Sequence, residues 1–283
     1  MEPLSPGLYL VATPLGNLAD ISARAKDVLS RVDVIACEDT REMKKLLSLI
    51  GVERGERNIV SLHEHNERER SGDIIEIILG GASVAYASDA GMPAISDPGA
   101  YLVDAAHEES VMVTSIPGAT AVTSAVALSG FTSSQFSFLG FFPRETKEKK
   151  AVVEKISTSR ATVVFYESPK RLSPTLRYLA DELHTHQRVV VCRELTKKFE
   201  EVIRGSLADI ANHFSGEVKG ECVVIIEANN DEPGNPDETA IRAAMSVLRR
   251  SGVSSRDTAN ALVELTKVPK NRLKEIYASI HDD

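Results

Sequence analysis

The sequence has few cysteines, and their spacing offers neither a disulfide framework nor a metal site. Its three cysteines, Cys37, Cys192 and Cys222, are odd in number and form no CxxC pair. Each lies in or beside an apolar run. Free cysteine behaves as a small buried hydrophobe, so we expect three buried thiols and no bound metal.

Long apolar runs and a basic leader are also missing. No apolar run of this 283-residue chain is long enough to span a bilayer. The first residues lack the basic region and apolar core of a secretory signal, so we expect a cytoplasmic protein with no membrane partner. The net charge of −8 argues against broad, non-specific binding of nucleic acid, which needs Lys and Arg, but it permits a local basic patch.

The common phosphate-binding sequences are absent. No GxxxxGK[ST] occurs, and the first apolar run is followed by TPLGN (13–17) instead of GxGxxG. The chain therefore lacks the phosphate cradle of P-loop nucleotide enzymes and that of dinucleotide enzymes.

What the sequence does contain first is a regular alternation of strands and helices. Helices are predicted near 20–31, 42–50 and 67–79, with Asp20 or Ser22 as a cap of the first. The runs between them are rich in Val and Ile, which favours strands at LYLVAT, VDVIACE, NIVSLH, SVAYAS and VMVTSIP. This alternation predicts an α/β domain with a largely parallel sheet.

The pattern changes after residue 118. A small-residue helix, ATAVTSAVALSG, is followed by the strands FSFLGF, ATVVFYES, RVVVCREL, EEVIRG and ECVVIIEA. The short gap between RVVVCREL and EEVIRG predicts an antiparallel hairpin, and hence a mixed sheet. A polar linker at 229–238 precedes helices near 238–250, 255–266 and 270–280. We expect domains at 1–118 and 119–229 and a helical segment at 237–283.

The segment SDAGMPAISDPG (88–99) is the most informative loop. It follows a predicted strand, and open α/β sheets bind ligands at the carboxyl ends of their strands. Asp89 and Asp97 would repel pyrophosphate but suit a ligand with hydroxyls and positive charge, such as S-adenosylmethionine. The alternative is that both aspartates cap helices or form Asx turns.

Eight stretches in a fixed order resemble the ribosomal small-subunit RNA methyltransferase I family of the tetrapyrrole-methylase superfamily. The resemblance runs to about residue 228. The stretches are ATPLGNLADI (12–21), CEDTR (37–41), HEHNERE (63–69), SDAGMPAISDPG (88–99), IPGATA (116–121), GFFPR (140–144), FYESPKRL (165–172) and RELTKKFEE (193–201).

This resemblance implies a fold, an activity and partners. The implied fold is two α/β domains with an S-adenosylmethionine cleft between them, in a homodimer. The implied activity is 2′-O-methylation of a cytidine ribose in the decoding region of the small-subunit (16S) ribosomal RNA. The small ribosomal subunit is then the macromolecular partner.

The resemblance also implies cofactor contacts on several loops. Where the family has proline, threonine and histidine, this chain has Ala119, Met92 and Lys170, and the first two changes bear on cofactor affinity. The implied cofactor residues are Pro14, Leu15, Asp89, Gly91, Ala94, Ile95, Gly118, Ala119, Thr120, Glu194, Leu195 and Cys222.

Three polar clusters at predicted strand ends supply the candidate catalytic residues. A ribose hydroxyl needs a base to take its proton, and we expect that base to be Glu167 or His65. Arg41 and Asn66 are expected to hold the RNA. Asp39 completes the set, although it is also predicted to cap the following helix and to pair with a nearby charge.

Some alternatives stay open at the level of sequence. A tetrapyrrole methyltransferase could use the same scaffold, and a non-catalytic binding protein could use the helical segment as its contact surface. The pattern of short helices in that segment is typical of a helix-turn-helix or of a simple helical cap. The basic residues that could contact RNA, or merely form solvated helix faces, are Arg41, Lys44, Lys45, Arg144, Lys147, Lys149, Lys150, Lys170 and Arg171.

Overall fold

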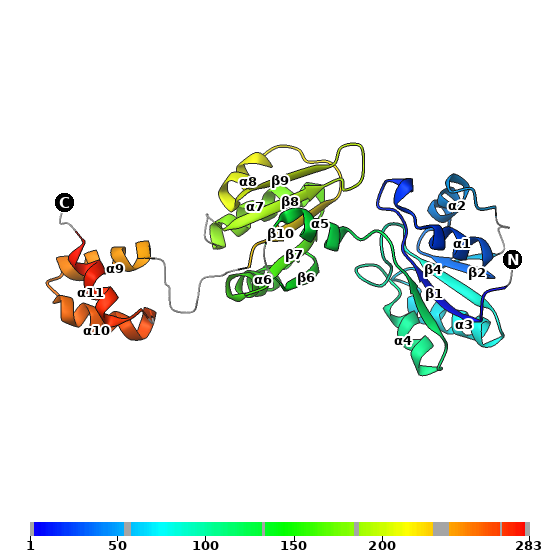
Figure 1. The fold of residues 1–283 in the computed structure, drawn as a ribbon, viewed down its shortest axis with the longest axis horizontal. Helices are drawn as coiled ribbons and strands as arrows, with labels where there is room; N and C mark the ends of the chain where they lie inside the picture. Colours follow the sequence, from blue (N-terminus) through cyan, green and yellow to red (C-terminus); the bar gives the residue numbers. More distant parts are fainter. Residues whose placement is uncertain are drawn as a thin grey trace. The chain divides into compact units, whose positions relative to one another are not determined.

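The computed structural model describes residues 3–53, 58–131, 134–183, 187–228, 238–266 and 268–280. Contacts along the chain divide it into two compact units, Met1–Ala228 and Asn229–Asp283. Within the described residues, the first unit holds two five-stranded sheets and the second unit holds three helices (Figure 1).

The first sheet is wholly parallel, as the alternation of strands and helices predicts. Its strands are β1 (Gly7–Val11), β2 (Val34–Cys37), β3 (Ile59–Ser61), β4 (Ser83–Ala87) and β5 (Val113–Ile116). Their order is β3-β2-β4-β1-β5, so β1 lies between β4 and β5. The loops that follow these three strands therefore emerge side by side at one edge of the sheet.

Helices pack on both faces of this sheet, and the residues of β4 are buried throughout. The helices are α1 (Ala23–Arg31), α2 (Thr40–Leu49), α3 (Glu67–Leu79) and α4 (Ala100–Glu108). Ser22 caps α1 through a hydrogen bond from Ala25 N, while the predicted start at residue 20 is a 3-10 turn, η1 (Leu18–Asp20). The sequence analysis did not predict α4.

The second sheet is mixed, and the predicted hairpin is confirmed. Its order is β6-β7-β10-β8-β9, with β6 parallel to β7 and every other pair antiparallel. The strands are β6 (Phe136–Phe141), β7 (Thr162–Glu167), β8 (Arg188–Arg193), β9 (Glu201–Ser206) and β10 (Cys222–Ile226).

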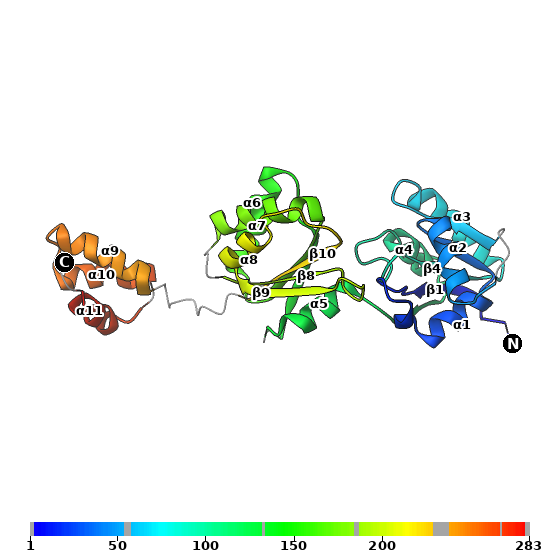
Figure 2. The same ribbon diagram turned by 90° about the horizontal axis from the view of Figure 1, so that it is seen from above.

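The two faces of the second sheet carry different helices (Figure 2). α5 (Ala121–Ser129) packs on one face, against Val164 and Ile225. The opposite face carries α6 (Thr146–Thr158), α7 (Pro169–Glu182) and α8 (Leu207–His213). α7 begins at Pro169, where a missing N–H costs nothing.

The second unit consists, in its described part, of α9 (Glu238–Arg250), α10 (Ser255–Thr266) and α11 (Lys270–Ala278). These bounds agree with the predicted helices, except that α11 ends two residues early. Met245 and Leu273 are fully buried in a core of this unit's own. Residues 229–237 of the predicted linker lie outside the described residues. No helix in the described ranges is long and apolar enough to cross a membrane.

Candidate functional site

The central loop, residues 88–99, is tied to the first loop by a pair of backbone hydrogen bonds. Thr13 N donates to Gly91 O over 2.9 Å, and Gly91 N donates to Thr13 O over 3.1 Å. Thr13 Oγ1 donates to Ser88 O over 3.0 Å. Gly91 has a φ of +87°, which favours glycine, so the fold uses this glycine to bring the two loops together.

The far end of the central loop is held by α3. The buried carboxylate of Glu67 accepts hydrogen bonds from Gly99 N (2.6 Å) and Tyr101 N (3.1 Å). These amides lie at the start of α4, where backbone N–H groups have no acceptor within the helix. Tyr86 Oη donates to Pro98 O over 2.7 Å. Between these anchors Ala94 adopts a φ of +62°, an uncommon backbone geometry for alanine.

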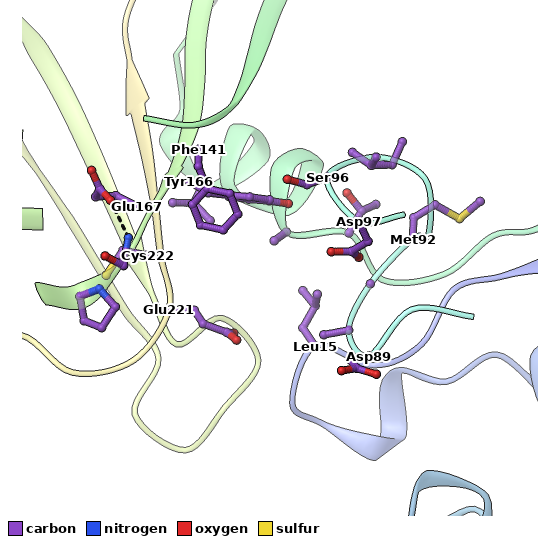
Figure 3. A pocket seen from close by; sticks show the side chains of 18 residues that line it. Leu15, Asp89, Met92, Ser96, Asp97, Phe141, Tyr166, Glu167, Glu221 and Cys222 are labelled. Carbon is purple, nitrogen blue, oxygen red and sulfur yellow. Dashed lines mark hydrogen bonds between the residues drawn. The ribbon is translucent and has the colours of Figure 1, made fainter. Parts of the chain in front are cut away.

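A cavity of about 360 Å³ opens beside this loop (Figure 3). One wall comes from loops of the first sheet. The other comes from the second sheet, at Phe141, Tyr166, Glu167 and the segment 221–223. Six of the expected cofactor residues line the cavity: Leu15, Asp89, Gly91, Ile95, Thr120 and Cys222.

The other six expected cofactor residues lie next to this lining in the chain or in space. Pro14, Ala94, Gly118 and Ala119 flank lining residues on the same loops. A Cβ on Gly118 would lie 2.9 Å from that of Ala12, so only glycine allows this approach. Glu194, which precedes Leu195, accepts a hydrogen bond from Glu221 N over 3.1 Å and pairs with Lys197 over 2.9 Å.

The carboxylates of the central loop lie close to one another in a negatively charged setting, with Asp97 half-buried and Asp89 exposed. Burial raises the pKa of Asp97, a hydrogen bond from Ser88 partly offsets this, and the charge of Asp89 raises it further. Burial also raises the pKa of Asp89 and that of Glu38. Because these negative charges repel one another, the site favours a ligand that is cationic or rich in hydroxyl groups.

Glu167 is the one expected catalytic residue that lines the cavity, and it is held firmly. Its Oε1 accepts a hydrogen bond from Ser168 N over 2.8 Å, and its Oε2 accepts one from Thr175 Oγ1 over 2.7 Å. Arg171 Nη2 lies 3.3 Å from Oε2. The side chain is fully buried behind the cavity wall, so its orientation is fixed before any ligand arrives.

Asp39 and Arg41 lie beside the cavity without lining it. Asp39 caps α2 by accepting a hydrogen bond from Arg41 N, and its carboxylate pairs with the exposed Arg41 guanidinium over 2.8 Å. That side-chain hydrogen bond holds the pKa of Asp39 well below its usual range. Asp39 N donates a hydrogen bond to Asp89 Oδ1 over 3.3 Å. The predicted cap and local ion pair are therefore confirmed.

His65 and Asn66 lie in the loop after β3, and neither lines the cavity. Asn66 shapes that loop, because its Oδ1 accepts a hydrogen bond from His63 N over 2.8 Å. The exposed His65 ring meets the His63 ring edge to face, with centroids 6.0 Å apart. These two residues therefore do not share the cavity lining with Glu167, and their expected roles stay predictions.

Two basic candidates for RNA contact are committed to contacts within the protein. Arg171 Nη2 donates to Phe142 O over 2.7 Å and to Pro143 O over 2.8 Å, so Arg171 ties the end of β6 to α7. Lys149 Nζ lies 5.5 Å from the centroid of the Tyr178 ring. For Arg171 the structure shows a structural role, and its contact with RNA stays a prediction.

Eleven of the eighteen lining residues were missing from the expected site, and three of them show why. Asp97 was expected, with Asp89, to suit a ligand such as S-adenosylmethionine, but it was not among the implied cofactor residues. Phe141 lies in GFFPR, where an aromatic residue at a strand end gives no chemical signal by itself. Nothing in the local sequence marks Glu221 as a site residue, because it reaches the cavity only when β10, which follows it, pairs antiparallel with β7.

Comparison with known proteins adds three findings. A family model described as Tetrapyrrole (Corrin/Porphyrin) Methylases matches residues 7–211. A protein of Halalkalibacterium halodurans called ribosomal RNA small subunit methyltransferase I is 40% identical over 277 residues, which is 95% of this chain and 94% of that protein. The Bacillus subtilis protein of the same name is 38% identical over 281 residues, 97% of this chain and 94% of its own.

A solved structure shares the fold. The uroporphyrin-III-C-methyltransferase of Thermus thermophilus superposes with a TM-score of 0.55 at 16% identity, covering 78% of this chain and 94% of its own. At that identity the likeness shows the arrangement of the two sheets and carries no information on the substrate.

Proposed function

The chain belongs to the ribosomal RNA small subunit methyltransferase I family of the tetrapyrrole methylases, and from this premise we propose that it methylates small-subunit ribosomal RNA. The finer proposal is 2′-O-methylation of a cytidine ribose in the decoding region of 16S RNA. The observation that carries it is the cavity between the central loop and the end of β7, which combines carboxylates, close-packed glycine loops and a fixed Glu167.

S-adenosylmethionine fits the residues present. Asp89 and Asp97 offer carboxylates to hydroxyl and ammonium groups, and Gly91 and Gly118 let the loops around the cavity pack closely against Leu15 and Ala12. When bound, this cofactor supplies a methyl group activated on a sulfonium. We assign the twelve expected residues, from Pro14 to Cys222, to its binding, with Asp97 added.

The lining residues of the second sheet that are not assigned to the cofactor, Phe141, Tyr166 and Glu167 among them, are then left to handle the ribose. Alignment of the reacting oxygen with the methyl group is the main requirement, and a rigid cavity wall meets it. Of the two expected bases, Glu167 is the one that belongs to the cavity lining. Its carboxylate has no exposed surface, so we propose that it takes the proton of the ribose hydroxyl once the substrate displaces the hydrogen bond from Ser168 or Thr175. Asp39, Arg41, His65 and Asn66 lie outside the cavity wall and are proposed to hold the surrounding RNA.

Replacement of Glu167 by glutamine tests the proposed base. Glu167→Gln keeps a side chain of the same shape but removes the negative charge, so we expect turnover to fall by about 100-fold or more, in the range of general-base catalysis. The affinity for S-adenosylmethionine should change little. His65→Ala is the matched variant, and a larger loss there than in Glu167→Gln would move the base to His65.

We further propose that the protein acts as a homodimer in the cytoplasm, where its ribosomal substrate is assembled. Light scattering should give twice the 30.7 kDa mass of one chain. A monomer that methylates subunits at full rate would refute the dimer proposal without affecting the proposed reaction.

A transfer assay with three substrates tests the proposed function. Labelled S-adenosylmethionine is offered with small subunits from cells that lack the modification, with naked ribosomal RNA, and with a reduced tetrapyrrole. Label in RNA supports the proposal. Label only in the tetrapyrrole would favour the tetrapyrrole alternative, and binding of the cofactor with no transfer at all would favour a non-catalytic binding protein.

A further inference from the structure

An aromatic ring lies at the cavity wall with much of its surface exposed. Phe141, the last residue of β6, lines the cavity and is 58% exposed. Its ring meets the Tyr166 ring edge to face, with centroids 5.5 Å apart, and Tyr166 lines the cavity as well (Figure 3). An aromatic face thus remains available beside the proposed site of methyl transfer.

The orientation of Phe141 is produced by an irregularity in β6. In a regular strand Phe141 would share a face with Leu139, which packs toward α6, α7 and α8. The pairing of β6 with β7 shifts register between Phe138 and Phe141, and Gly140 there has a φ of +68°. This bulge turns Phe141 to the face of Phe138, the cavity side, and bulges often re-aim a side chain beside an active site.

The bulge is also fixed in place. Phe142 N donates to Tyr166 O over 3.0 Å, and Arg171 donates to the carbonyl oxygens of both Phe142 and Pro143. Arg171 in turn lies 3.3 Å from Glu167. The proposed base and the exposed ring are therefore held by one guanidinium, so their spacing is set by the protein before the substrate binds.

From this geometry we propose that Phe141 is the stacking platform for the base of the target nucleotide. The inference rests on the proposed function, since it names how that same site holds its RNA. Proteins that recognise single-stranded RNA stack its unpaired bases on aromatic side chains, and enzymes that modify a base take it out of the stack in the same way. Stacking on Phe141 holds the target nucleoside beside Glu167 while its ribose hydroxyl faces the cavity.

Turnover of undermethylated small subunits by Phe141→Ala is the first test. Loss of one base–aromatic stack lowers kcat/KM by about tenfold or more, while the dissociation constant for S-adenosylmethionine stays within about twofold. Phe136→Ala is the matched control, because Phe136 is 45% exposed at the other end of β6 and does not line the cavity. Phe141→Tyr keeps a ring and should retain most of the activity.

Subunits reconstituted with an abasic ribose at the target position provide the second test. On that substrate the wild type and Phe141→Ala should have equal kcat/KM, because no base remains to stack. The proposal is overturned if Phe141→Ala matches Phe136→Ala on normal subunits, if its loss persists undiminished on the abasic substrate, or if it loses cofactor affinity in step with turnover. Failure of the wild type to label ribosomal RNA would instead refute the proposed function itself.

Discussion

At the scale of single residues, the site uses side chains for two purposes that the sequence does not distinguish. Asp39 and Asp97 are both aspartates in segments that join a strand to the next helix. Asp39, however, caps a helix and forms an ion pair, whereas Asp97 lines the cavity. The difference lies in what packs against each carboxylate. Spacing alone therefore predicted a ligand role for the loop, but not the partners of each acid.

Replacement of Asp97 should separate stability from binding. Burial raises the pKa of Asp97, so the ionised carboxylate costs stability at pH values above that raised pKa. Asp97→Asn should therefore raise the melting temperature of the ligand-free protein at pH 7.5, and this gain should vanish as the pH falls below the ordinary aspartate pKa. The affinity for S-adenosylmethionine should fall about tenfold or more, as for a lost hydrogen bond to a charged group.

Thermal unfolding at pH 7.5 and at a pH below the ordinary aspartate pKa measures the change in stability. Calorimetric titration with S-adenosylmethionine measures the change in affinity. Asp104→Asn on the exposed side of α4 is the matched control and should change neither quantity. A lower melting temperature for Asp97→Asn at pH 7.5 would show that the ionised carboxylate stabilises the fold.

At the scale of elements, the order of the strands decides which loops meet. The strands were predictable from their Val- and Ile-rich runs, and the bounds of α3 and α9 from helical patterns between turn signals. No local sequence pattern predicts the strand order that brings the loops after β1, β4 and β5 together. α4 was missed because its start is marked by no side-chain cap of its own, and Glu67 on α3 supplies the acceptor instead.

Loss of that acceptor should destabilise the first unit. Glu67→Ala leaves the buried amide of Gly99 and the partly buried amide of Tyr101 without their partner, which costs about 2 kcal/mol or more. For a unit of this size we expect the melting temperature to fall by about 4–8 °C. Glu76→Ala, on the exposed side of the same helix, is the control. Equal melting temperatures for the two variants would contradict the assigned role of Glu67.

At the scale of the whole molecule, every residue that lines the cavity belongs to the unit Met1–Ala228. A chain that ends after Ala228 should therefore bind S-adenosylmethionine with an affinity within about twofold of the full chain, well under the tenfold that 1.4 kcal/mol produces. Calorimetric titration of both proteins checks this. Loss of binding on truncation would mean that residues 229–283 complete the cofactor site.

The fold class and the two-sheet plan were predictable because local patterns repeat over most of the chain. The domain bounds 1–118, 119–229 and 237–283 stay predictions, since the contacts keep residues 1–228 in one unit. The contacts of Arg171 and Glu221 were not predictable, because both depend on strands that pair only after the chain has folded.

The central claim is methyl transfer to a ribose of small-subunit ribosomal RNA, and the position of the methyl group tests it most directly. RNA from treated subunits is digested in alkali, which cleaves every linkage except those next to a blocked 2′ oxygen. We expect the label to survive in an alkali-resistant dinucleotide whose 5′ residue is cytidine. Label released as a base-methylated mononucleotide, or recovered in no RNA at all, would contradict it.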